Sequence, residues 1–271
     1  MLLIHGIPGS AKTWTPVAEG LAAAGFEVLV PDLLGFGASD RPGDVDGLHI
    51  DAQAAALSEL LAATRDRPVI VVGHDYGVPI AVTIAHRMPR SVSGLVLAAG
   101  NLFTDTPIPM PLNIIPAPVV GKLAARMLMS RPMLRAMLRL GVGQPPPWLN
   151  PAHYLGDSRQ SQAIRMIFSA SLRELPDRYR EVEAALGELQ APSVVIWGGR
   201  DPFFGIEQAR RAAAAIPDAE LRIEPDAGHF LPAERPAAFI DAVRQIQGRV
   251  QATAHEPAAR PDLHPNSAGD R

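Results

Sequence analysis

The most informative segment of this sequence is Val71-Val72-Gly73-His74-Asp75-Tyr76-Gly77, an apolar strand pattern that meets a helical pattern at Val78. Glycines two residues before and two residues after a central residue permit a sharp, strained turn between a strand and a helix. Such a turn lifts the central side chain above the sheet, where it can act as a nucleophile. The central residue here is Asp75, so the segment predicts a carboxylate nucleophile. The alternative is an aspartate that only caps the following helix.

A carboxylate nucleophile restricts the chemistry. It displaces a leaving group from an sp³ carbon, and that carbon stays on the enzyme as an alkyl ester. Water must then attack the carboxyl carbon of Asp75, with a general base to activate the water. Epoxides and alkyl halides fit this scheme, whereas ordinary esters and amides do not. We therefore predict a hydrolase that works through a covalent alkyl-enzyme ester.

The predicted base and its partner follow two strand patterns near the C-terminus. Asp201 comes after Ser193–Trp197, and His229 comes after Glu220–Glu224. Catalytic groups of open parallel sheets gather at the carboxyl ends of the strands, and the order nucleophile, acid, histidine is typical of one such fold. We expect His229 to activate water and Asp201 to hold its tautomer. Asp105, which follows another strand pattern, is the alternative acid.

A second loop faces the same edge of the predicted sheet. The segment His5-Gly6-Ile7-Pro8-Gly9 follows the first strand pattern, and its glycines permit a tight turn. The backbone amides of Ile7 and Tyr76 are the predicted oxyanion hole, which would hold the oxygen of the Asp75 ester during hydrolysis.

Strand patterns alternate with helical patterns along the chain, which predicts a mostly parallel sheet covered by helices on both faces. We assign residues 1–105 and 188–248 to this core. Residues 106–187 are broken by prolines and biased towards helix, and we interpret them as a helical cap over the site. Residues 249–271 show no periodicity, and we expect a disordered tail. The predicted strands are Leu2–His5, Glu27–Pro31, Val69–Gly73, Gly94–Ala98, Ser193–Trp197 and Glu220–Glu224.

These segments resemble the α/β-hydrolase superfamily, in the branch with an aspartate nucleophile that holds epoxide hydrolases and haloalkane and haloacetate dehalogenases. The resemblance implies the α/β-hydrolase fold with a helical cap. It also implies that the first two strands of the family's sheet are lacking here, since the chain begins at what resembles the third. The Glu27–Pro31 strand would then be an uncovered edge. We expect a misplaced start site or a shortened chain, with a homodimer through that edge as the alternative. The matching segments are His5–Gly9, Asp32–Pro42, Gly73–Gly77, Trp197–Pro202 and Gly228–Phe230.

The resemblance also bears on the substrate. Haloalkane dehalogenases tend to carry Trp after the nucleophile and haloacetate dehalogenases Arg, whereas this chain has Tyr76. Epoxide hydrolases use cap tyrosines to protonate the epoxide oxygen, and Tyr154 and Tyr179 are the tyrosines of the predicted cap. Epoxide hydrolysis on a small apolar molecule is therefore the leading hypothesis, ahead of carbon–halogen hydrolysis. A low-turnover binding protein or a biosynthetic rearrangement on the same fold is the alternative of another class.

Composition limits the partners. The chain has no cysteine, and no ligand cluster or phosphate-binding glycine loop, so we expect no metal and no cofactor. The formal net charge is −3 and the charges are scattered, so the sequence shows no basic patch of the kind that binds nucleic acid. No apolar run is long enough to span a membrane, and a cytoplasmic protein without a membrane partner is expected. The segment Lys122–Leu140 is basic and rich in methionine, with Arg131, Arg135 and Arg139 on one helix face. We interpret it as a cap helix with arginines in water, and contact with anionic lipid is an alternative.

Overall fold

The computed structural model describes residues 1–108, 110–117, 120–143, 145–146, 149–155, 158–173 and 175–255. Its five parallel strands lie side by side in the order in which they occur in the chain. Every residue of β2 is buried, as expected for a strand with helices on both faces. The strands are β1 (Leu2–Ile4), β2 (Val69–His74), β3 (Val92–Ala98), β4 (Ser193–Gly198) and β5 (Ala219–Glu224).

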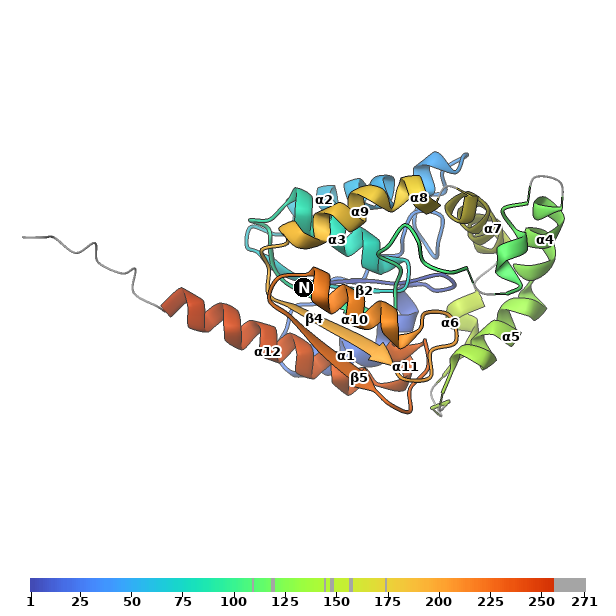
Figure 1. Ribbon diagram of the computed structural model, residues 1–271. Coiled ribbons are helices and arrows are strands. Elements are labelled where there is room, and N and C mark those ends of the chain that lie inside the picture. The colour runs from blue at the N-terminus through green and yellow to red at the C-terminus, as the bar shows by residue number, and fades with distance from the viewer. Residues whose placement is uncertain are drawn as a thin grey trace, which may run out of the picture.

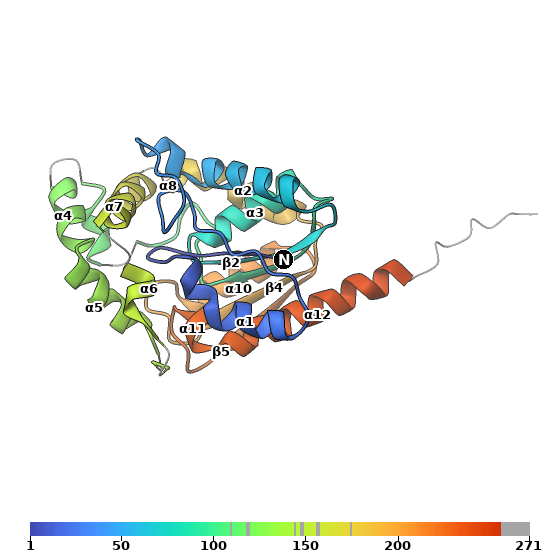
Figure 2. The same cartoon turned by 180° about the vertical axis from the view of Figure 1, so that it is seen from behind.

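Helices cover both faces of this sheet (Figures 1 and 2). On one face α1 (Thr15–Ala23) packs against the long α12 (Pro236–His255), which crosses β3 and β4. On the other face α3 (Gly77–Arg87) lies on β2 and β3 and is covered by α2 (Ile50–Thr64). This layered α/β-hydrolase architecture is the predicted fold. Further core elements are η1 (Ala11–Trp14), η2 (Asp46–Leu48), α10 (Ile206–Ala215) and α11 (Leu231–Glu234).

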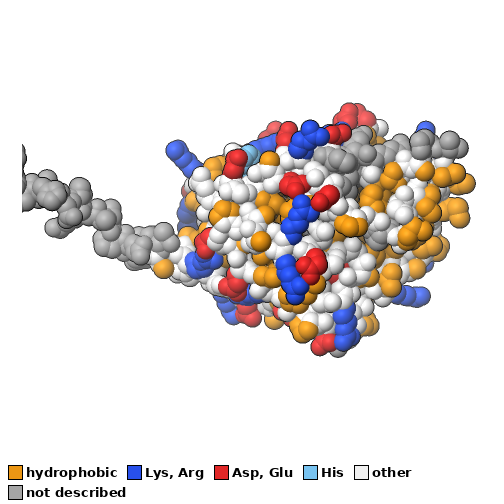
Figure 3. Space-filling model, viewed as in Figure 1, with side chains coloured by type: hydrophobic (Ala, Val, Ile, Leu, Met, Phe, Trp, Pro, Cys, Tyr) orange, Lys and Arg blue, Asp and Glu red, His pale blue; other side chains and the backbone are white. Residues whose placement is uncertain are grey.

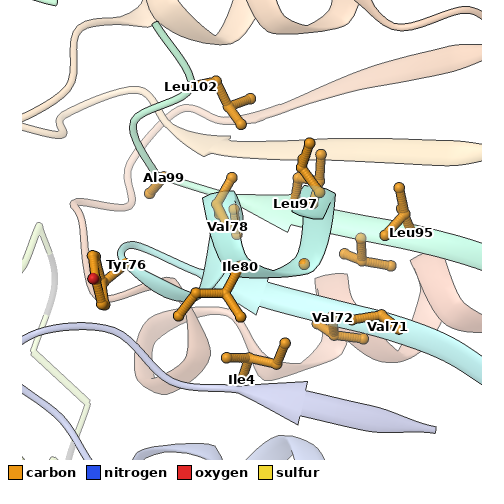
Figure 4. Packing of buried hydrophobic residues seen from close by; sticks show 14 of the residues in the cluster. Ile4, Val71, Val72, Tyr76, Val78, Ile80, Leu95, Leu97, Ala99 and Leu102 are labelled. Atoms are coloured by element: carbon orange, nitrogen blue, oxygen red, sulfur yellow. The ribbon is translucent and has the colours of Figure 1, made fainter. Parts of the chain in front are cut away.

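The start of α3 is the centre of the core. All residues from Gly77 to Ala85 are buried, so the helix is apolar on every side and is held between the sheet and α2. Figure 4 shows its first turn, with Val78 and Ile80, over the strands that carry Ile4, Val72 and Leu97. This packing fixes the position of the turn between β2 and α3.

The segment between β3 and β4 forms the cap. Its helices α4 to α7 gather at one end of the molecule, beyond the tip of the β4 arrow, which is the carboxyl end of the sheet (Figure 1). The last cap helix, α9, packs against α3, so the chain has rejoined the core before the predicted boundary at residue 187. The elements are η3 (Leu112–Ile114), α4 (Gly121–Leu128), α5 (Arg131–Gly141), α6 (Pro151–Leu155), α7 (Ser158–Arg173), α8 (Leu175–Arg178), α9 (Arg180–Ala185) and η4 (Leu186–Glu188).

The prediction of a strand at Glu27–Pro31 is wrong. The structure has only an isolated parallel bridge between Leu29 and Leu2, with the Leu3 amide donating to the Leu29 carbonyl at 2.9 Å. The three residues of β1 pair regularly with β2 on their other side, so this edge of the sheet ends in a single bridge instead of a sixth strand. Among the described residues, no strand covers the outer side of this segment.

The predicted tail boundary also needs correction. Helix α12 continues to His255, past the expected start of the tail at residue 249. Residues 249–255 contain neither proline nor glycine, and the next proline is Pro257, so nothing in the sequence stops the helix earlier. The rest of the predicted tail, residues 256–271, lies outside the described residues.

Candidate active site

The turn between β2 and α3 places Asp75 at the carboxyl end of the sheet. Asp75 adopts a φ of 52°, a left-handed conformation that costs energy for any residue other than glycine. Both flanking glycines are required by close backbone contacts. A Cβ on Gly73 would lie 2.5 Å from the Gly77 carbonyl oxygen, and a Cβ on Gly77 would overlap the Ile4 carbonyl. The surrounding backbone thus holds the Asp75 side chain above the sheet.

The Asp75 carboxylate lies between the two predicted partners. Its Oδ2 accepts a hydrogen bond from the Ile7 amide at 2.6 Å, and its Oδ1 lies 3.5 Å from His229 Nε2. Burial would raise the pKa of Asp75, but His229 and the Ile7 amide outweigh burial and hold that pKa below its ordinary value. The group is therefore an ionised carboxylate in a site shielded from water.

His229 is held from its other side by Asp201. The Asp201 Oδ2 lies 2.9 Å from His229 Nδ1, while its Oδ1 accepts the amides of Phe203 and Phe204 at 2.8 and 3.0 Å. The two backbone amides thus hold one oxygen of this fully buried carboxylate, and the other oxygen faces the histidine. The alternative acid, Asp105, is instead exposed and paired with Arg211. The structure brings Asp201 to the histidine, and Asp105 stays away.

Two carboxylates make His229 a strong base. Burial alone would lower the pKa of His229, but Asp201 and Asp75 more than offset it and raise the pKa to about 10. The resting site is therefore an imidazolium between two carboxylates. If Asp75 becomes an ester, its charge disappears and one of these stabilising partners is lost. The pKa of His229 must then fall, which frees Nε2 to take a proton from water.

This charge coupling can be measured directly. With a pKa raised to about 10, His229 should keep both ring protons at pH 8 in nitrogen-15 NMR spectra. In Asp75→Asn, which mimics the neutral ester, the His229 pKa should be lower. His74, whose pKa burial lowers to about 4, should stay neutral at pH 8 in both proteins and serves as the internal control. A His229 pKa that is unchanged by Asp75→Asn would contradict the coupling.

Two buried groups that sequence reasoning missed position the histidine loop. His74 Nε2 lies 2.8 Å from the His229 carbonyl, and because a carbonyl oxygen can only accept, this nitrogen donates to it. The Glu234 carboxylate accepts the amides of Gly228 at 3.0 Å and of Gly143 at 2.8 Å, and so links this loop to the cap. Glu234 directly follows the apolar run from Phe230 to Ala233, and an acidic residue at that point was the available signal.

A cavity of about 120 Å³ lies over Asp75, between the core and the cap. Its wall is mostly apolar, with phenylalanines and aliphatic side chains facing a few polar groups. No Lys, Arg or Trp lines it among the described residues. The wall consists of Ile7, Pro8, Asp75, Tyr76, Asn101, Thr106, Pro107, Ile108, Leu112, Met137, Ile167, Leu172, Tyr179, Phe203, Phe204, His229 and Phe230.

The two predicted cap tyrosines are placed differently. Tyr179 lines the cavity. Tyr154 is buried outside the cavity wall, with its ring edge-on to Phe230 at a centroid distance of 5.1 Å. The hydroxyl of Tyr76, the residue after Asp75, donates a hydrogen bond to the Leu48 carbonyl at 3.0 Å. Its hydrogen is therefore not available to a substrate.

The described residues contain no cluster of three or more metal-binding side chains. Within the same part of the chain, no helix has both the length and the apolar character needed to cross a membrane.

The chain is similar to a wide range of known proteins. The family described as the alpha/beta hydrolase fold matches residues 1–236. An uncharacterized protein of Mycobacterium tuberculosis is 29% identical, covering 96% of this chain and 78% of the relative. A 2-hydroxy-6-oxononadienedioate/2-hydroxy-6-oxononatrienedioate hydrolase of Paraburkholderia xenovorans is 28% identical, covering 88% and 83%.

Solved structures support the same fold. A haloalkane dehalogenase loop variant from Bradyrhizobium elkanii superposes with a TM-score of 0.77 at 20% identity, over 94% of this chain and 91% of that chain. The epoxide hydrolase CorEH superposes with a TM-score of 0.75 at 21% identity, over 92% and 91%. Likeness at these identities establishes the architecture and leaves the reaction to the site itself.

Proposed function

The chain belongs to the α/β-hydrolase fold family, and from that premise we propose that it hydrolyses a small apolar epoxide through a covalent ester on Asp75. The observation that carries the proposal is a carboxylate at the nucleophile turn, with a backbone amide on one oxygen and a histidine beside the other. Lipases and esterases of this fold carry serine at this turn and attack acyl carbons. A carboxylate instead attacks an sp³ carbon, which is what a strained epoxide ring offers.

In the first step Asp75 attacks a ring carbon. A new bond forms between the carboxylate oxygen and that carbon, the ring carbon–oxygen bond breaks, and the ring oxygen takes a proton from a donor in the cavity wall. Asp75 becomes a neutral ester, so the His229 pKa falls and its proton restores the donor. The enzyme then holds a neutral histidine beside the ester.

Tyr179 is the donor that the cavity supports best. Asn101 Oδ1 already accepts the Phe103 amide at 3.1 Å and the Thr106 hydroxyl at 2.5 Å, so the NH₂ group of Asn101 is the group left to face the tyrosine. That NH₂ forms no regular hydrogen bond with a described residue. Burial raises the pKa of Tyr179, and the nearby Asn101 amide partly opposes this. A hydrogen bond from this NH₂ to the phenol oxygen in the substrate complex would leave the hydroxyl hydrogen for the substrate.

In the second step water attacks the carboxyl carbon of Asp75. His229 Nε2 takes a proton from this water, and Asp201 stabilises the resulting imidazolium. The amides of Ile7 and Tyr76 stabilise the oxyanion that develops. The intermediate collapses as the bond between the carboxyl carbon and the alkoxide breaks, and the alkoxide takes the proton of the newly added hydroxyl. A diol leaves, and the carboxylate and imidazolium of the resting site are restored.

Replacing Tyr179 by phenylalanine should lower kcat/KM for an epoxide by about 100-fold, the lower end of the range for a positioned acid. Tyr154→Phe is the matched control, since Tyr154 lies outside the cavity wall and its hydroxyl has no hydrogen-bond partner among the described residues. That variant should stay within about threefold of wild type, allowing for small packing changes. Steady-state kinetics of both variants check this. Equal losses in both variants would contradict a donor role for Tyr179.

Other reactions at the same site give different products. An aryl epoxide should yield a diol, a haloalkane would yield free halide and an alcohol, and a rearrangement would yield an isomer. The absence of Lys and Arg from the described cavity wall disfavours a haloacetate, whose carboxylate needs a cation. Product analysis by mass spectrometry with each substrate tests the proposal. Release of halide without any diol formation would assign the dehalogenase branch instead, and neither product would favour a binding role.

A further inference from the structure

The outer side of the cap carries an unusual set of apolar side chains. Every large apolar residue that is exposed in the described chain lies between residues 110 and 140, and these side chains are 39% to 71% exposed. Figure 3 shows hydrophobic side chains gathered at the end of the molecule where α4 and α5 lie in Figure 1. The exposed residues are Met110, Ile114, Val120, Leu123, Met127, Met133 and Leu140.

Cations are interleaved with these apolar side chains. On α4, Lys122 and Arg126 are exposed next to Leu123 and Met127, and on α5 Arg135 and Arg139 are exposed next to Leu140. None of these four cations forms an ion pair with a described acidic residue. The sequence has no Asp or Glu from residue 106 to residue 156, although the whole chain has a net charge of −3. We call this set of exposed apolar and cationic side chains the cap surface.

The positive charge of the cap surface favours an anionic partner. A second copy of the same surface would bring two sets of cations together, which costs energy at close range. An anionic phospholipid membrane suits both parts of the surface, because apolar side chains enter the boundary of the acyl chains while Lys and Arg extend to the phosphates. We propose that the cap surface docks this protein on anionic phospholipid membranes.

The inner side of the same cap segment lines the cavity. Met137 of α5, Leu112 of η3 and Ile108 before it all contribute to the cavity wall. Docking through the outer side would therefore hold the cavity next to the lipid, where apolar molecules concentrate. The docking itself does not depend on which reaction Asp75 performs.

Co-sedimentation with vesicles tests the proposal. The purified full chain should bind vesicles of phosphatidylcholine with phosphatidylglycerol and bind pure phosphatidylcholine vesicles much more weakly. Each cation near an anionic surface contributes about fivefold in partitioning, so Arg126→Glu, Arg135→Glu and Arg139→Glu combined should weaken binding at least about 100-fold. Leu123→Ser, Met127→Ser and Leu140→Ser combined should also weaken it. Added salt should weaken binding of the wild type.

The matched control reverses two exposed cations of the core, Arg67→Glu and Arg90→Glu, which should leave vesicle binding nearly unchanged. Circular dichroism and turnover of a water-soluble substrate should show that all variants are folded. Equal binding to both kinds of vesicle, or a cap variant that binds like wild type, would overturn the proposal. A concentration-dependent dimer that the cap variants abolish would also overturn it and assign the surface to a second copy.

Discussion

His229→Gln should lower turnover of an epoxide by at least about 1000-fold while an ester accumulates on the enzyme. The size of the loss follows from removal of a catalytic base, which costs several orders of magnitude in related triads. Attack by Asp75 needs an ionised carboxylate and no base. Loss of His229 removes the contact that lowers the Asp75 pKa most, so the variant is assayed at pH 8, which favours ionisation of a carboxyl group still bonded to the Ile7 amide. Intact-protein mass spectrometry should therefore show the variant heavier by the mass of one substrate.

Two controls make this result specific. In the double variant His229→Gln with Asp75→Asn, the mass increase should disappear, since an amide is a poor nucleophile. In a single turnover of the wild type in oxygen-18 water, the label should enter the Asp75 carboxylate before it enters the diol. Label that appears in the product at once, with unlabelled Asp75, would mean that water attacks the substrate directly. That outcome would exclude the ester.

Asp201→Asn should lower turnover by about 10⁴-fold, the cost measured for the corresponding change in a serine-protease triad. The amide can donate to His229 Nδ1 and would then favour the wrong tautomer, in which Nε2 carries the hydrogen and cannot accept one from water. The pKa of His229 should also fall, because Asp201 is the carboxylate that raises it most.

Asp105→Asn is the matched control for that variant. Asp105 also follows a strand end, but its carboxylate is exposed and pairs with Arg211 of α10. Its replacement should change kcat by less than about twofold, because an exposed ion pair that does not contact His229 contributes little to stability and nothing to the triad. Steady-state kinetics and thermal unfolding of both variants separate a catalytic loss from a loss of fold. A large effect of Asp105→Asn with a small effect of Asp201→Asn would reverse the assignment.

The geometry also predicts that the nucleophile turn tolerates little change. Gly6 lies so close to Asp75 that a Cβ there would come within 2.6 Å of the Asp75 Oδ2. The same closeness lets the Ile7 amide reach that oxygen at 2.6 Å. The loop after β1 and the turn after β2 are thus fitted to each other, although more than sixty residues separate them in the chain.

The layered fold and the position of Asp75 could be predicted from local sequence. The Gly-x-Asp-x-Gly turn between an apolar strand and a helix is a backbone requirement, so the residue types alone placed Asp75 at the carboxyl end of the sheet. Alternating strand and helix patterns indicated the parallel layered fold, and the chain order of Asp75, Asp201 and His229 indicated which loops would meet. These features depend on conformational preferences within a few residues, which is why sequence determined them.

Other features depend on contacts between distant segments, and only the tertiary structure decided them. Asp105 and Asp201 both follow strand ends, and although the sequence favoured Asp201, it is the packing of the loop after β4 that brings Asp201 to His229. Tyr154 and Tyr179 look equivalent in sequence, and the path of the cap places Tyr179 in the cavity wall. Glu234 links the cap to the His229 loop across more than ninety residues of chain. No local propensity encodes such pairings, because their energies arise when the folded chain brings the two segments together.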